Sequence, residues 1–160
     1  MHLLFPAGLR RKVVAAEVAQ ESVGPLREMI SRTAAGSDVF RHWAGASSSH
    51  VVALAPEIRS HFEEKLRRLS ELDEGNRTLR RQLLARITLL LRSPKLLKSE
   101  LPHLRKEVQV LLERDRSAVL GVRDVASQVM DQRKQAEIDP RVLEQIESMR
   151  RRLQQEREQE

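Results

Sequence analysis

The sequence predicts an all-α protein, an elongated helical hairpin or coiled-coil-like bundle with short accessory helices. Aromatic residues make up only 2% of the 160 residues, although large aromatic side chains carry much of the burial in compact cores. Gly and Pro number six each, while charged residues reach 32%. Leu, Ile and Val recur at gaps of three and four over long segments, which is the spacing of one helix face. This combination is typical of long helices.

Residues 56–135 are predicted to form the helical hairpin. The first helix is expected to open at Pro56, because Pro suits the first helical position and the following acid suits a helix start. Pro94 should stop it, since Pro disfavours helical geometry at the residue before it. The second helix is expected to begin near Ser99. Two helices of similar length joined by a short segment with Pro can fold back antiparallel.

The stretch LSELDEGNRTLRRQLL, residues 69–84, contains a Gly-Asn pair among helically spaced leucines. With Phe62 at heptad position a, Asn76 and Leu90 also fall at a, so the phase is the same on both sides of the pair. One continuous helix explains this register better than a turn, although Asp, Gly and Asn favour turns. An Asn buried at position a would fix register at some cost in stability. The alternative is that Asn76 faces solvent.

The apolar stripes of both predicted helices are broader than a two-stranded seam. Leu66 and Ile87 lie beside the a and d positions of the first helix, and Asp115 falls at an a position of the second. A broad stripe indicates more than one facing helix. We therefore expect a further layer, supplied either by short helices of this chain or by another chain.

From this unmet burial we predict a helical partner interface. It comprises Phe62, Leu66, Leu69, Leu72, Asn76, Leu79, Leu83, Ile87, Leu90, Leu104, Val108, Leu111, Val122, Val129, Ile146 and Met149.

The two ends of the chain are predicted to be less regular. Residues 1–50 are expected to be loosely structured, with a short helix from Pro25 to Gly36 and a flexible joint at residues 45–49. Residues 139–160 are expected to form a short amphipathic helix that starts at Pro140 and ends in a frayed polar tail.

No motif in the sequence predicts a catalytic, cofactor or metal site. The absence of Cys excludes disulfides and thiolate ligands in this chain. Glu57, His61 and Glu64 share a helix face, but this small set is typical of a solvated polar face. The Ser and His residues of AGASSSH, residues 44–50, lie in the predicted joint and lack the rigid frame that a triad needs. We therefore expect a non-enzymatic protein.

The net charge of +6 is spread along the chain. Arg clusters at Arg77, Arg80 and Arg81 and at residues 150–152 suit phosphate contact. The aromatic platforms of single-strand binders are missing, and ion-paired faces are the simpler interpretation.

The function predicted is a non-enzymatic helical scaffold or adaptor subunit that assembles by coiled-coil or bundle packing with itself or with partner subunits. The alternative is an Arg-rich helical protein associated with RNA or a ribonucleoprotein. No apolar run reaches the roughly 20 residues that span a bilayer. An intracellular location, cytoplasmic or nuclear, is expected, with the basic, acid-poor residues 1–16 leaving a mitochondrial location as the alternative.

Overall fold

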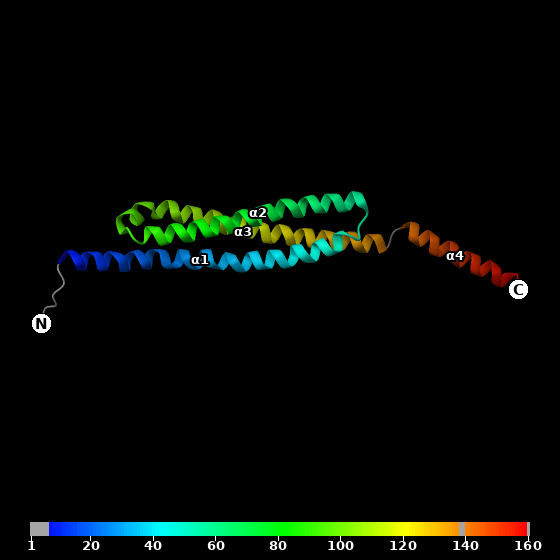
Figure 1. Cartoon of the computed structure of the whole chain (residues 1–160). Coiled ribbons are helices and arrows are strands. Elements are labelled where there is room, and N and C mark those ends of the chain that lie inside the picture. Colours follow the sequence, from blue (N-terminus) through cyan, green and yellow to red (C-terminus); the bar gives the residue numbers. More distant parts are fainter. Residues whose placement is uncertain (1–6, 138–139, 160) are drawn as a thin grey trace.

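The computed structural model describes residues 7–137 and 140–159, and within them it contains four helices and no strand. These are α1 (Ala7–Val51), α2 (Pro56–Leu90), α3 (Pro94–Glu137) and α4 (Pro140–Glu158). Figure 1 shows α1, α2 and α3 side by side in an elongated bundle, with α4 beyond one end of it. The predicted all-α class and the helical hairpin are confirmed.

The three bundle helices follow an up-down-up course. Short turns at residues 52–55 and 91–93 make consecutive helices antiparallel, so that α1 and α3 run in the same direction. Each of the three helices packs against both of the others. No helix of the described chain combines the length and the apolar character needed to cross a bilayer.

Helix α1 differs most from the sequence-based expectation. The described part of residues 1–50 was predicted to hold short helices and a joint, and this prediction is wrong, because one helix of 45 residues runs from Ala7 to Val51. Pro25 lies inside this helix, and residues 45–49 are helical too. Gly36 does not end the helix.

The reason is a regular seam on α1 that tertiary packing stabilises. Its buried positions, separated by gaps of three and four or by a full heptad, are Val23, Leu26, Ile30, Thr33, Ser37, Phe40, Ser47 and Val51. Each large apolar side chain buried here contributes about 1.5–3 kcal/mol. Together they outweigh the cost of about 3 kcal/mol for a Pro and about 1 kcal/mol for each Gly in a helix interior. The seam was missed because several of its positions carry hydroxyl side chains.

Helix α2 confirms the prediction that one continuous helix runs through the Gly75-Asn76 pair. It begins with Pro56 at its first position and Glu57 in its first turn, and it passes through Gly75 without a break. The helix ends at Leu90, where the Leu91 N–H donates to the Ile87 carbonyl over 3.0 Å.

Helix α3 starts earlier than predicted, at Pro94 instead of near Ser99. Pro94 is tolerated because the first helical N–H has no partner within the helix in any case. Pro102 lies on the exposed face of α3, where water can reach the carbonyl that its missing N–H leaves free. In α4 the tail predicted to fray is helical as far as Glu158, so that expectation is wrong up to this residue.

Two hydrophobic clusters form the core of the bundle. The cluster at the α2–α3 turn contains Val23, Leu26, Ile30, Leu83, Ile87, Leu90, Leu97, Leu104, Val108 and Leu111. The cluster at the α1–α2 turn contains Phe40, Val51, Leu54, Phe62, Leu66, Ala118, Val122, Val125 and Val129. Buried polar residues of α1 and α2 separate the two clusters, and the half-buried Asp115 lies at the same level of α3.

Candidate assembly site and buried polar layer

The predicted interface residues of α2 and α3 lie inside the bundle. The fully buried ones are Phe62, Leu66, Asn76, Leu83, Ile87, Leu90, Leu104, Val108, Leu111, Val122 and Val129. Leu69, Leu72 and Leu79 are partly buried and pack against the two clusters. The further layer that the sequence called for is therefore α1 of the same chain.

The burial pattern also explains the broad stripe of α2. Phe62, Asn76 and Leu83 share the seam with Leu66 and Ile87, which a strict two-stranded frame leaves outside it. A helix that faces two neighbours buries a wider arc than one that faces a single partner. On α3, Val108 and the other apolar residues at predicted a and d positions are buried in the frame that the sequence indicated, whereas Asp115 is half-buried.

The middle of the bundle contains what we call the polar layer, which the structure brings together from three helices. Its members are Thr33 and Ser37 of α1, Asp73, Asn76 and Arg80 of α2, and Asp115 of α3. Sequence reasoning identified Asn76 and Asp115 as seam residues and missed the others. The sequence did contain a signal for Asp73 and Arg80, because they follow Leu66 at seven-residue intervals and share the heptad position of Ile87.

Arg80 connects α2 to α1 within the polar layer. Its Nε donates to Thr33 Oγ1 over 2.8 Å, and its guanidinium also donates to the Thr33 carbonyl over 2.8 Å and to Ser37 Oγ over 2.6 Å. Thr33 Oγ1 in turn donates to the Ile30 carbonyl over 2.6 Å. Hydrogen bonds from a charged donor are worth about 1.5–3 kcal/mol each when partly buried. This contact therefore fixes the register of α1 on α2.

Asn76 and Asp73 are less well satisfied than Arg80. Asn76 is completely buried, and neither atom of its amide has a hydrogen-bond partner within the described chain. One carboxylate oxygen of Asp73 lies 3.2 Å from Arg77 Nε without good hydrogen-bond alignment, and the other has no partner there. Buried polar atoms without partners cost about 1–3 kcal/mol each. The polar layer thus sacrifices stability, as a buried register-setting group does.

Asp115 completes the polar layer from α3. Burial raises the pKa of its carboxyl group above the ordinary value of 3.8, nearby Arg80 lowers it, and the negative charge of Asp73 raises it. The Asp115 carboxylate occupies the space beside Gly36 of α1, where any Cβ would overlap it. Gly36 therefore allows α1 and α3 to approach closely at this level.

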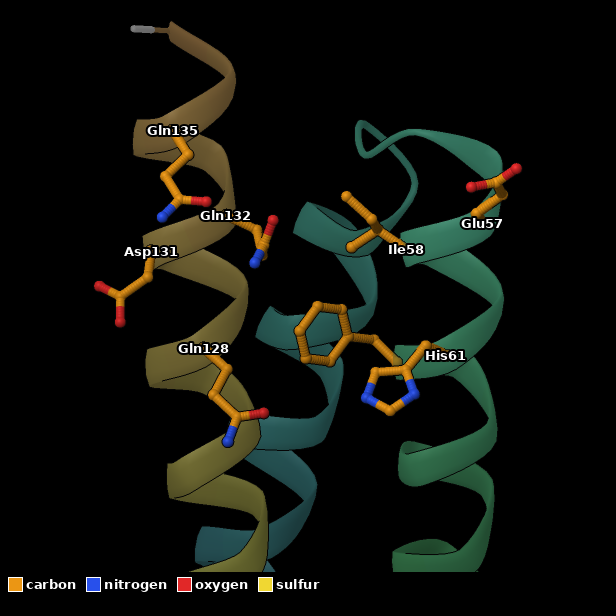
Figure 2. A pocket seen from close by; sticks show the side chains of 8 residues that line it. Glu57, Ile58, His61, Gln128, Asp131, Gln132 and Gln135 are labelled. Atoms are coloured by element: carbon orange, nitrogen blue, oxygen red, sulfur yellow. The ribbon is translucent and has the colours of Figure 1, made fainter. Parts of the chain in front are cut away.

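An open groove of about 540 Å³ lies between the start of α2 and the end of α3. Ile58 of α2 and Gln132 of α3 point toward one another across it, whereas the carboxyl groups of Glu57 and Asp131 point outward (Figure 2). His61 also lines this groove. The carboxyl groups of Glu57 and Asp131 therefore do not converge on one point of the groove.

Helix α4 carries the predicted interface residues Ile146 and Met149, which the bundle does not cover, and Leu153 lies on the same face. Ile146, Met149 and Leu153 are 43%, 62% and 58% exposed and fall on one face at gaps of three and four. Among the described residues, no bundle helix packs extensively on α4. These large apolar side chains give α4 an exposed apolar face within the described part of the chain.

The Arg clusters do not form one exposed basic surface. Arg80 points into the polar layer, and Arg77 pairs with Asp73. On α4, Arg151 lies 3.9 Å from Glu147 on the side opposite the apolar face. Arg77, Arg80 and Arg151 therefore have partners within the chain, as the ion-paired interpretation expects.

Comparison of the chain with known protein families, with curated proteins and with solved structures found no match.

Proposed function

We propose that this protein is a non-enzymatic helical adaptor, in which the three-helix bundle is a rigid module and α4 is the assembly element. The observation that carries the proposal is the exposed apolar face of α4, formed by Ile146, Met149 and Leu153. The bundle closes its own seams with α1, so the residues of α2 and α3 first predicted as partner contacts are occupied within the chain. Among the described side chains, those of α4 form a seam that stays open, and assembly then depends on this helix.

The geometry of α4 supports this role. The helix has 19 residues, which makes it about 28 Å long. Most helical stability in proteins comes from packing of the apolar face, and α4 has no extensive packing of this kind within the described chain. A partner helix would supply that packing. Figure 1 shows α4 extending away from the bundle, where a second helix could lie along it.

Photocrosslinking from α4 tests the proposal. A benzophenone amino acid replaces Met149 on the apolar face in one variant, and Arg151 on the opposite face in the matched control. In cells that produce the chain, we expect discrete crosslinked species from position 149 and few from position 151. Leu153→Asp should remove the crosslinks from position 149 while the bundle stays folded. Equal crosslinking from both faces, or crosslinks that survive Leu153→Asp, would refute assembly through this face.

A further inference from the structure

The charges beside the apolar face of α4 indicate what kind of helix can cover it. With Ile146 and Leu153 at position a and Met149 at d, Arg150 and Arg157 fall at e and Arg152 at g. The e and g positions flank the seam and face the corresponding positions of the partner. Both flanks of this seam are therefore basic.

The acidic residues of α4 lie mainly elsewhere on the helix. Glu144 and Glu158 fall at f and Glu147 at b, which is the surface opposite the seam. Glu156 falls at d and ends the apolar seam in the last turn. The helix as a whole is nearly balanced in charge, but three of its arginines flank the seam, whereas Glu144, Glu147 and Glu158 lie behind it together with Arg151.

This sorting disfavours a second copy of α4 as the partner. In a parallel pair, Arg152 at g faces Arg157 at e of the other copy, and like charges at these positions repel. In an antiparallel pair, e faces e and g faces g, which again places arginine against arginine. Both arrangements of two α4 copies therefore place arginine against arginine, whereas acidic flanks on a partner would attract these arginines.

A membrane surface is also disfavoured as the partner. Amphipathic helices that lie on membranes combine a wide apolar face, often with aromatic anchors, with a basic polar face. The apolar face of α4 is narrow, and the segment contains no Phe, Trp or Tyr. The glutamates behind the seam would face the anionic surface potential around such a helix.

We infer that α4 binds an acidic amphipathic helix of a different protein, with apolar residues at its a and d positions and Glu or Asp at its e and g positions. This inference rests on the proposed function, because it names the partner of the same seam. The arginines flank the seam on both sides, so an acidic partner gains favourable pairs in either orientation. Specificity comes from the repulsion that excludes homotypic pairing as much as from the attraction.

The test uses designed probe peptides with the full chain. Each of the two peptides has three heptads with Ile at a and Leu at d. The Glu peptide has Glu at every e and g position, and the Lys peptide has Lys at these positions. Binding of the labelled peptides is followed by fluorescence anisotropy at low and at high salt. Vesicles of phosphatidylcholine with phosphatidylserine serve as the membrane probe. The Arg150→Glu/Arg152→Glu/Arg157→Glu variant reverses the flanking charge, and Met149→Asp breaks the seam.

We expect the Glu peptide to bind at least about tenfold more tightly than the Lys peptide at low salt, because three or more exposed ion pairs each contribute modestly. The preference should shrink at high salt, where exposed charges are screened. The charge-reversed variant should prefer the Lys peptide, and Met149→Asp should bind neither.

Other results separate this inference from the function on which it rests. Equal affinity for both peptides that is lost in Met149→Asp would overturn the acidic partner and leave assembly through α4 intact. Binding of the vesicles with no binding of either peptide would overturn both, and so would equal peptide binding by Met149→Asp and the unchanged chain.

Discussion

Arg80 of α2 donates two hydrogen bonds of 2.8 Å to Thr33 of α1, one to the hydroxyl and one to the carbonyl oxygen. The pair lies in the polar layer between the two hydrophobic clusters. It joins α1, whose full length the sequence did not predict, to α2, which the sequence predicted well. Because neighbouring apolar layers can slide past one another by a heptad at little cost, a polar contact of this kind specifies one register.

Coupling between Arg80 and Thr33 is the first prediction. Arg80→Ala and Thr33→Val should each destabilise the bundle, and the double variant should lose less than the sum of the two. We expect a coupling free energy of about 1–3 kcal/mol, since the donor is charged and partly buried. Urea unfolding of the four chains measures it. A coupling near zero would mean that the hydrogen bonds do not form in solution.

Replacing Asn76 by Leu should raise the free energy of unfolding by about 1–3 kcal/mol, because it removes a buried amide without partners. Leu83→Asn is the matched control one heptad away, and it should destabilise the bundle by burying a new unpaired amide. Thermal unfolding followed by circular dichroism reports both changes. A destabilised Asn76→Leu chain would show that the amide is satisfied in solution.

Gly36 and Gly75 should respond differently to an added methyl group. Gly75→Ala places the methyl in open space in the middle of α2 and should stabilise the chain by about 1 kcal/mol. Gly36→Ala has the same gain in helix propensity, but its methyl would overlap the Asp115 carboxylate, which must move aside. Chemical denaturation should therefore give Gly36→Ala a lower free energy of unfolding than Gly75→Ala, and equal values would contradict this contact.

The polar layer also makes stability depend on pH through Asp115. Burial raises the pKa of this carboxyl in the folded chain above the ordinary value of 3.8. Between pH 3.8 and the raised pKa, the folded state therefore binds more protons than the unfolded state. The contribution of Asp115 to stability is therefore fully present below pH 3.8 and is lost as the pH rises through the folded pKa. The facing groups that act on it are Arg80, which lowers the pKa, and Asp73, which raises it.

Asp115→Asn isolates this effect. The variant should be more stable than the unchanged chain at pH 7, and its advantage should shrink as the pH falls toward 3.8. Subtracting the two stability curves removes the titration of the other carboxyl groups, including that of Glu64, whose pKa is lowered to about 2 by hydrogen bonds from Arg67 and Arg68. An advantage that does not change with pH would contradict the raised pKa of Asp115.

The fold of α2 and α3 could be predicted because their seams are mostly apolar. Val108, Leu111 and Val122 keep one heptad phase, and the unbroken phase around Asn76 correctly indicated a continuous helix. The need for a further layer was also visible, since Leu66 and Ile87 made the stripe too wide for one partner.

The role of α1 could not be predicted because its local signals conflict with its tertiary environment. Pro25 and Gly36 are helix breakers in isolation, and Thr33 and Ser37 interrupt the apolar period. Only packing against two other helices makes this segment helical throughout. The polar layer was missed for a related reason. Charged residues such as Arg80 are read as solvated faces unless the helix opposite them is known.

The central claim is that α1, α2 and α3 close on one another within a single chain and that, among the described side chains, the seam of α4 stays open. Hydrogen exchange followed by mass spectrometry, over a series of protein concentrations, tests it most directly. We predict slow exchange in residues 23–40, 62–90 and 104–129, with similar rates in the three segments at every protein concentration. Exchange in residues 140–158 should be fast. Fast exchange in residues 23–40, or protection of α2 and α3 that grows with concentration, would contradict the claim.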